Sequence, residues 1–452
     1  MERLAARPPS PLPTHAAALE IAADLEHALT RAASVGIRGR VSKAVGMLIH
    51  ASGVQAHVGE LCELTTPGEP PLLAEVVGFA GGTAILTPLG PITGISALTE
   101  VIPSGRGHVC PVGDGLLGRV LNALGEPTDG LGPLDVHAHL PVHREPLNPL
   151  QRRLIERPLA TGIRVVDGLL TLGEGQRVGV FAPPGIGKST LLGMLARGST
   201  ADVNVIALIG ERGREVKEFL EYNLGAAGLA RTVMIASTSD RPPMERIKSA
   251  YAATTIAEHF RDQGKRVLLV MDSLTRFARA QREIGLASGE PPTRRSYPPS
   301  IFSMLPQLLE RAGTGRTGSI TAVYSVLTEG DEENDPIAEE VRAILDGHIV
   351  LSRKLAAANH YPAIDVLASV SRVMSHIVPR EHRAAAAQFR SLMARHQELE
   401  MLIQIGEYQA GSDALADRAI ESRPAMQAFL AQAPETSVPF DKTEAALRRL
   451  VG

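Results

Sequence analysis

Residues 177–190 read RVGVFAPPGIGKST, an apolar run followed by a loop with two glycines and then a lysine–serine pair. The loop from Ala182 to Ser189 matches the pattern G-x-x-x-x-G-K-[ST], with alanine in place of the first glycine. The apolar run before the loop is typical of a buried strand, and LLGMLARG after it is typical of a helix. This strand–loop–helix context is the one that the motif requires, so the sequence predicts a loop that binds the phosphates of a nucleoside triphosphate.

The residue types in the loop suit that chemistry. Gly185 and Gly187 allow backbone angles that turn successive N–H groups toward a phosphate. The amino end of the following helix favours the same anion. Lys188 is expected to neutralise the β- and γ-phosphates, and the Ser189 hydroxyl to bind Mg²⁺. The predicted nucleotide-binding residues of the loop are Pro184, Gly185, Ile186, Gly187, Lys188, Ser189 and Thr190.

Two other apolar runs end in an acidic residue. Asp272 ends RVLLVMD, where an acid beside a phosphate loop would hold Mg²⁺, although an aspartate at this position could instead cap the next helix. Glu211 follows VIALIG, where it could polarise the attacking water. Glutamate is also common in the first turn of a helix as a solvated acid, and the spacing does not separate these two interpretations.

Between about residues 165 and 352, strand-like runs alternate with helical patterns, which predicts an α/β domain with a parallel sheet covered on both faces. We expect 35–103, with short runs broken by Gly and Pro, to form a small β-barrel. The predicted domains are a flexible tail and amphipathic helix at 1–34, the β-barrel at 35–103, an ATP-binding catalytic domain at 104–374 and a helical domain at 375–452.

Composition limits the classes of function. The net charge of −3 does not indicate a nucleic-acid or membrane partner, and two cysteines are too few for a disulfide framework. No apolar run approaches the ~18 residues of a membrane span, and the first 20 residues lack the apolar stretch of a secretory signal. These observations predict a soluble protein of a reducing, intracellular compartment. His137, His139 and His143 suggest a metal site, but the segment leads into the ATPase domain without an arrangement of carboxylates that would complete one, and we expect solvated or packing roles.

Five stretches together resemble the ATPase of type III secretion systems, a family with flagellar export and virulence injectisome branches that is similar to the catalytic subunits of rotary ATP synthases. The resemblance covers about residues 35–452. It implies a P-loop NTPase with a RecA-like catalytic core, an N-terminal β-barrel and a C-terminal helical domain. The stretches are PLATGIRVVDGLLTLGEGQRVGVFAPPGIGKST (158–190), IGERGREVKEF (209–219), VLLVMDSLTRFARAQREI (267–284), DGHIVLSR (346–353) and YPAIDVLASVSRVM (361–374).

The resemblance implies a role for each matching position. Lys188, Ser189 and Asp272 match the phosphate- and Mg²⁺-binding residues, and Glu211 matches the catalytic glutamate. Members of the family form homohexameric rings with each nucleotide between two subunits. The remaining matches are Arg212 near the γ-phosphate, Tyr361 packing on adenine, and Arg372 as the arginine finger that a neighbouring subunit supplies.

The function implied is an ATP-hydrolysing motor that releases chaperones and unfolds cargo for export. Its implied cofactors are ATP and Mg²⁺. Its implied partners are a stalk protein, a negative regulator, chaperone–effector complexes and an export gate, which would place it in the cytoplasm at the inner-membrane face of the apparatus. The loop APPGIGKST and the stretch IQIGEYQAGSD (403–413) favour the injectisome over the flagellar branch.

Other functions share this core. A hexameric RNA helicase of the transcription-terminator type also has an N-terminal barrel, but single-strand binding usually needs aromatic platforms, and Phe79 is the only aromatic residue before Phe181. We therefore expect no nucleic-acid partner. A rotary synthase subunit would assemble from two chain types rather than one. Retention of Lys188 and Glu211 argues against a regulatory subunit that does not hydrolyse ATP.

Overall fold

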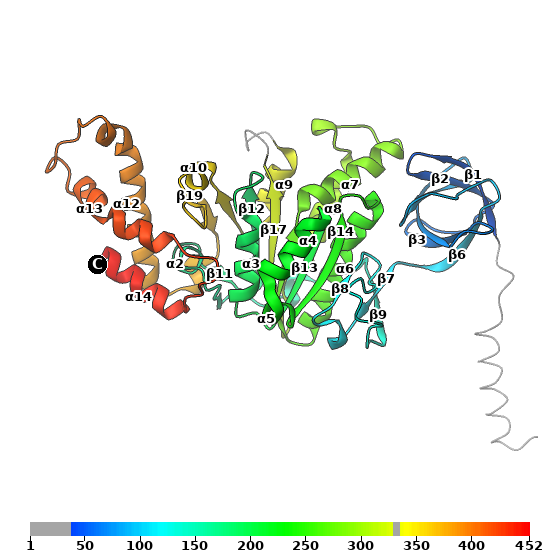
Figure 1. Ribbon diagram of the computed structural model, residues 1–452, viewed down its shortest axis with the longest axis horizontal. Helices are drawn as coiled ribbons and strands as arrows, with labels where there is room; N and C mark the ends of the chain where they lie inside the picture. The colour runs from blue at the N-terminus through cyan, green and yellow to red at the C-terminus, as the bar shows by residue number, and fades with distance from the viewer. Residues whose placement is uncertain (1–37, 329–334) are drawn as a thin grey trace, which may run out of the picture.

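The computed structural model describes residues 38–328 and 335–452, which form three parts in a row (Figure 1). A β-barrel lies at one end, a core built on one large sheet in the middle and a helical domain at the other end. This arrangement confirms the predicted fold class. The flexible tail and amphipathic helix expected at 1–34 lie outside the described residues.

The barrel is closed by six strands in the order β1-β2-β5-β4-β3-β6. Alternating residues such as Val41, Leu64 and Val76 point inward and form a small apolar core. The strands are β1 (Gly39–Val45), β2 (Leu48–Ser52), β3 (Glu60–Thr65), β4 (Leu72–Ala80), β5 (Thr83–Pro88) and β6 (Glu100–Gly107).

The core is built on one nine-stranded sheet, in the order β19-β18-β12-β17-β15-β13-β14-β8 with β16 beside β17. Strands β8, β12–β15, β17 and β18 pair in parallel, whereas β16 and β19 pair antiparallel. The strands of this sheet are β8 (Val120–Leu121), β12 (Arg177–Ala182), β13 (Val203–Glu211), β14 (Thr232–Thr238), β15 (Arg266–Asp272), β16 (Gly313–Thr314), β17 (Ser319–Leu327), β18 (Gly347–Leu351) and β19 (Ile364–Ser371).

Helices cover both faces of this sheet, which explains the near-continuous apolar runs of its strands. Within β13, Val205 and Ala207 pack toward the face with α6–α9, while Ile206 and Leu208 pack toward the face with α2 and α3. The helices are α2 (Arg164–Leu169), α3 (Lys188–Gly198), α4 (Gly213–Glu218), η3 (Phe219–Leu224), α5 (Gly225–Leu229), α6 (Pro243–Asp262), α7 (Leu274–Ala287), η4 (Arg294–Ser296), α8 (Pro299–Leu309), α9 (Pro336–Ile344) and α10 (Arg353–Ala357).

Short elements connect the barrel to the core, and helices alone continue the chain after β19. Residues of α12–α14 such as Phe389 and Leu447 belong to the same apolar cluster as α2 and α3, so the helical domain is packed directly on the core. The connecting elements are β7 (Val109–Val112), η1 (Asp114–Leu116), β9 (Ala138–Pro141), η2 (Pro149–Gln151), β10 (Pro158–Leu159) and β11 (Leu172–Gly173). The C-terminal helices are α11 (Met374–Ile377), α12 (Arg380–Gln404), α13 (Ala414–Leu430) and α14 (Phe440–Val451).

A buried ion pair joins the barrel to the core. Glu75 of β4 contacts Lys248 of α6, and only 1% of the Lys248 side chain is exposed. Leu73 and Val77, on either side of Glu75, pack against the core cluster that contains α6. Burial raises the pKa of Glu75 and lowers the pKa of Lys248, so each charge depends on the other. The pair therefore stabilises one position of the barrel relative to the core.

Lys248→Met is expected to destabilise the protein by about 3–5 kcal/mol, because it leaves the Glu75 carboxylate buried without its partner. The midpoint of urea unfolding measures this loss. The double variant Glu75→Met with Lys248→Met should recover most of it, since two apolar side chains can replace a buried pair. A single variant as stable as the unmodified protein would contradict this role for the pair.

Candidate active site

The phosphate loop has the geometry that its sequence predicts. Strand β12 ends at Ala182 and helix α3 begins at Lys188, after Gly187 with φ 88°. Gly185 has φ 81°, and an added Cβ there would meet no atom within 4 Å, so its backbone angle alone calls for glycine. The loop therefore leaves space in front of the amino end of α3, where an anion is favoured.

The sheet brings the two predicted acids to Lys188. Strands β12, β17, β15 and β13 are neighbours and run in parallel, so their carboxyl ends meet at one edge. There the Lys188 Nζ pairs with Asp272 and lies 3.9 Å from the Glu211 Oε1. The three side chains are at most 13% exposed. This cluster places a cation and two carboxylates where the phosphates of a nucleotide would enter.

Asp272 does not cap the following helix. The side chain of Ser273 caps α7 by accepting a hydrogen bond from the Arg276 N–H. Asp272 instead points into the cluster, where its Oδ1 accepts a hydrogen bond of 2.6 Å from the Ser325 hydroxyl. The structure thus separates the two interpretations that the sequence left open for this residue.

Glu211 is a buried acid rather than a solvated one. Its Oε1 has no hydrogen-bond partner among the described residues. Burial raises the pKa of Glu211 to about 7, and the nearby charge of Asp272 adds to the increase, while Lys188 opposes it. A carboxylate with a free oxygen and a pKa near neutral is suited to accept a proton from water.

The pH dependence of turnover is expected to report this shift. A base must be deprotonated to act, so kcat/KM for ATP should rise with pH on its acidic limb and level off above an apparent pKa of about 7. Steady-state hydrolysis between about pH 5.5 and 9 would measure the profile. An acidic limb near the ordinary glutamate value would contradict the assignment of Glu211 as the base.

Tyr361 lies beside the phosphate loop. A Cβ added to Gly187 would meet the Cε1 of Tyr361 at 3.3 Å, so the ring lies against the backbone of the loop. The ring remains 38% exposed, which leaves a face open to a flat ligand. Tyr361 stands just before β19, so the fold brings it to the loop from a segment 174 positions away (361 − 187). This placement is compatible with the predicted contact to adenine.

Two predicted arginines lie away from the cluster. The Arg212 side chain is 73% exposed and pairs with Glu215 at 3.2 Å. Arg372 follows β19, which runs antiparallel to β18, and its N–H bonds to the Asp346 carbonyl just before β18. Asp346 also accepts a hydrogen bond from the N–H of Arg177, the first residue of β12. Arg372 is therefore at the edge where β12 begins, about 20 Å from the edge that carries Lys188.

Sequence reasoning assigned no role to Arg276 and Ser325, which both face the cluster. The stem of Arg276 packs on Gly210, just before Glu211, and its Nε is buried without a hydrogen-bond partner among the described residues. A guanidinium with a buried, unpartnered Nε beside a phosphate site is suited to contact an anion. Arg276 follows Asp272 by four residues, in the first turn of the helix after β15. This position is the feature of the sequence that could have indicated a role in the site. Ser325 lies inside an apolar strand and gave no signal.

The oxygen donors at this edge fit Mg²⁺. Asp272 offers one carboxylate and Ser189 an exposed hydroxyl at the start of α3, and magnesium in such sites takes one or two protein oxygens, with phosphate and water completing its shell. Among the described residues, no group of three or more His, Cys, Asp and Glu side chains could hold a metal by itself. Ser189 and Asp272 would therefore hold the ion together with the nucleotide.

Comparison with known proteins places this site in a family. Residues 162–371 match the nucleotide-binding domain of the ATP synthase alpha/beta family, 41–105 match its beta-barrel domain, and 378–449 match the C-terminal domain of the T3SS EscN ATPase. The type 3 secretion system ATPase of Xanthomonas euvesicatoria is 58% identical over 91% of this chain and 93% of the relative. The chain belongs to the type III secretion ATPase family. Accordingly, it is an enzyme that hydrolyses ATP.

Other members of this family show the same architecture. The assembled ATPase EscN of enteropathogenic E. coli superposes with a TM-score of 0.87 at 47% identity, over 92% of this chain and 100% of that chain. The flagellum-specific ATP synthase of Treponema pallidum is 50% identical over 94% of this chain and 96% of the relative, so the flagellar branch is also close. Within 38–328 and 335–452, no helix has the length and apolar character needed to cross a membrane.

Proposed function

We propose that this type III secretion ATPase is the motor of an injectisome and acts as a homohexameric ring with its active sites shared between subunits. One observation carries the shared site. Lys188, Glu211 and Asp272 meet at one edge of the sheet, whereas Arg372 extends from the opposite edge. Arg372 cannot reach the phosphate loop of its own subunit, but it can reach that of a neighbour in a ring.

The residues of the cluster divide the reaction between them. Lys188 would exchange Asp272 for the β- and γ-phosphates, and the backbone N–H groups of the loop would hold the same anion. Bound with Ser189 and Asp272, Mg²⁺ would neutralise phosphate charge. Glu211 would orient the attacking water and accept its proton at Oε1. Arg372 of the neighbouring subunit, together with Arg276, would stabilise the charge that spreads over the γ-phosphate oxygens, and Arg212 would join them after leaving its pair with Glu215.

Apolar surface near Arg372 supports the ring. Leu150 and Leu154 are 95% and 80% exposed. Leu154 and Val373, the residue after Arg372, line the same depression on this edge. Exposed apolar residues around a charged residue are typical of a surface that another subunit covers. The solved relative EscN is itself an assembled ATPase.

The tip of the helical domain is the proposed contact for the stalk protein. Met401 and Ile405, one turn apart at the end of α12, are 73% and 62% exposed. A solved structure shows the assembled ATPase EscN in complex with its central stalk EscO, at 46% identity and a TM-score of 0.85. The negative regulator, chaperone–effector complexes and export gate complete the proposed partners. ATP hydrolysis would release chaperones and unfold cargo in the cytoplasm, at the inner-membrane face of the apparatus.

The two alternative functions are a flagellar export ATPase and an RNA helicase. The injectisome branch is supported by relatives at 58% and 53% identity, from Xanthomonas euvesicatoria and Sinorhizobium fredii, against 50% for the flagellum-specific relative from Treponema pallidum. An RNA helicase is disfavoured by the barrel, because Phe79 is its one aromatic side chain and a single ring gives no continuous stacking platform.

A pull-down of the tagged full chain from its own bacterium tests the function. It is expected to recover the stalk and export-gate proteins of an injectisome. A variant with Met401→Ser and Ile405→Ser should lose the stalk protein while keeping ATP turnover. Recovery of flagellar export proteins would assign the chain to the other branch, and recovery of RNA that depends on Phe79 would support the helicase.

A further inference from the structure

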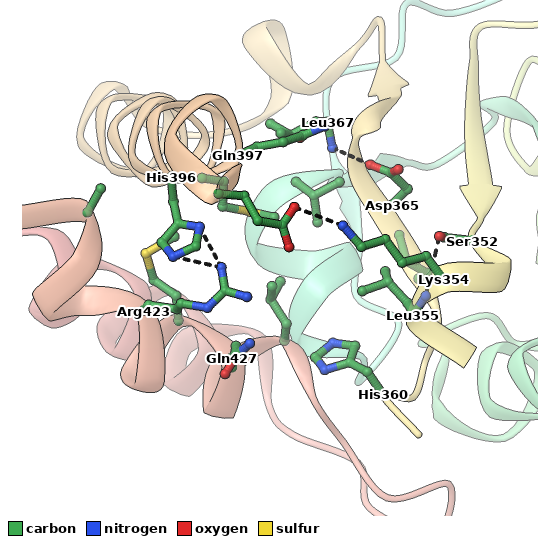
Figure 2. Close-up of a pocket in the computed structure, with 17 residues that line it drawn as sticks. Ser352, Lys354, Leu355, His360, Asp365, Leu367, His396, Gln397, Arg423 and Gln427 are labelled. Atoms are coloured by element: carbon green, nitrogen blue, oxygen red, sulfur yellow. Dashed lines mark hydrogen bonds and ion pairs between the residues drawn. The ribbon is translucent and has the colours of Figure 1, made fainter. Parts of the chain in front are cut away.

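A cavity of about 220 Å³ lies between the helical domain and the core. It is beside β19, the edge strand of the sheet. Figure 2 shows its walls: Lys354, Leu355 and Asp365 come from the core, and His396 and Arg423 come from α12 and α13. None of these residues belongs to the active site described above. The cavity is therefore a separate feature that both domains build.

Two cations and two carboxylates line the cavity, and among them only Lys354 and Glu400 form an ion pair. Lys354 pairs with Glu400 at 2.8 Å. The Oδ1 of Asp365 accepts hydrogen bonds of 3.0 Å from the N–H groups of Leu367 and Ala368. Within the described chain, Arg423 has no carboxylate within 4.0 Å, and the only hydrogen-bond partner of its side chain is His396 (Figure 2).

His396 does not neutralise Arg423. The Arg423 Nη1 lies 2.5 and 2.9 Å from the two ring nitrogens of His396, so the guanidinium lies against the face of the ring and not along one lone pair. Burial and the adjacent guanidinium lower the pKa of His396, so the ring is uncharged at neutral pH. Arg423 therefore brings a guanidinium without an ion pair, and most of its N–H donors, to the cavity, where Glu400 acts on its charge from beyond 4.0 Å.

The rest of the lining is apolar or neutral. Ile364, Val366, Met426 and Leu430 are buried side chains that line the cavity. Gln427 extends from α13 at the rim, where Figure 2 shows it between Arg423 and His360. An apolar cavity of 150 Å³ holds benzene, so this larger one has space for about ten non-hydrogen atoms.

We propose that this interdomain cavity binds a small organic anion, with the carboxylate on Arg423 and a ring-sized apolar body between the core and the helical domain. Charge-assisted pairing of a guanidinium with a carboxylate supplies orientation, and burial of the body supplies affinity. Such a ligand touches both domains, so it binds best to one relative orientation of the two. The proposal goes beyond ATP hydrolysis and does not depend on the injectisome assignment.

The test is isothermal titration calorimetry on the full chain with 3-phenylpropionate, and with 3-phenylpropanamide as a neutral probe of the same shape. The carboxylate is expected to bind one per subunit below about 1 mM, and the amide at least about tenfold more weakly, because the amide forms no charge-assisted bond with Arg423. No binding of the carboxylate at that concentration, or equal binding of the two probes, would overturn the proposal.

Substitutions in the lining of the cavity test whether 3-phenylpropionate binds there. Arg423→Gln should weaken 3-phenylpropionate at least about tenfold, Arg423→Lys should retain part of the affinity, and Arg449→Gln on exposed α14 is the matched control with no expected change. Gln427→Trp, an exposed rim position, should fill the cavity and abolish binding without a buried substitution. Unaltered affinity in Arg423→Gln or in Gln427→Trp would place the probe elsewhere and overturn the proposal. Circular dichroism and ATP turnover confirm that each variant is folded.

Discussion

Arg372→Ala is expected to lower kcat for ATP by about 10³- to 10⁵-fold, because a guanidinium that stabilises the transferring phosphoryl group is worth that much in related sites. Steady-state phosphate release measures the loss. Nucleotide binding should change far less, since Arg372 lies at the edge of the sheet opposite its own phosphate loop. The effect would then appear in kcat and not in the affinity for ADP.

Mixing variants distinguishes a shared site from a site within one subunit. Arg372→Ala subunits keep Lys188, and Lys188→Ala subunits keep Arg372, so neither alone forms a complete site. In a random ring of equal parts, about a quarter of the interfaces regain both groups, and turnover should recover in proportion. Absence of recovery at every ratio, with rings still forming, would contradict a finger that acts in trans.

Glu211→Gln is expected to lower kcat by about 10²- to 10⁴-fold, since glutamine keeps the shape of the side chain but cannot accept a proton at neutral pH. Binding of ADP should persist, because Lys188 and the loop are unchanged. The substitution should also remove the acidic limb near pH 7 from any residual pH profile, which a merely structural role would leave in place.

Glu218→Gln is the matched control for that substitution. Glu218 is the last residue of α4, and its side chain is 40% exposed where it pairs with Arg214. Loss of this surface pair is worth little, so turnover should stay within about twofold. Comparable turnover in Glu211→Gln and Glu218→Gln would show that Glu211 is not the base.

Local patterns were sufficient for much of the fold. Apolar runs ending at Ala182, Glu211 and Asp272 predicted β12, β13 and β15 because strands buried on both faces need apolar side chains at every position. The glycines of the phosphate loop predicted its backbone because few residues adopt positive φ. The six longer strands between 165 and 352 could therefore be predicted from the sequence.

Other features depended on strand order, which no local pattern contains. The spacing could not decide whether Glu211 was a solvated acid or Asp272 a helix cap. The sheet decided both, since it brings their strands next to β12 and buries their carboxylates around Lys188. Arg276 was missed for the same reason, because its environment is formed by Gly210 on a neighbouring strand.

The sequence by itself was sufficient to predict that the loop Ala182–Ser189 binds a nucleotide, because the motif and its strand–helix context are contiguous along the chain. Only the tertiary structure decided which side chains share that site and which lie apart from it. Tyr361 comes just before β19 and Arg372 comes just after it. Because β19 runs from one edge of the sheet to the other, antiparallel to β18, it places Tyr361 against the loop and Arg372 at the opposite edge. Burial then raises the pKa of Glu211, because desolvation depends on the atoms that surround a carboxylate in space and not on its neighbours in the chain.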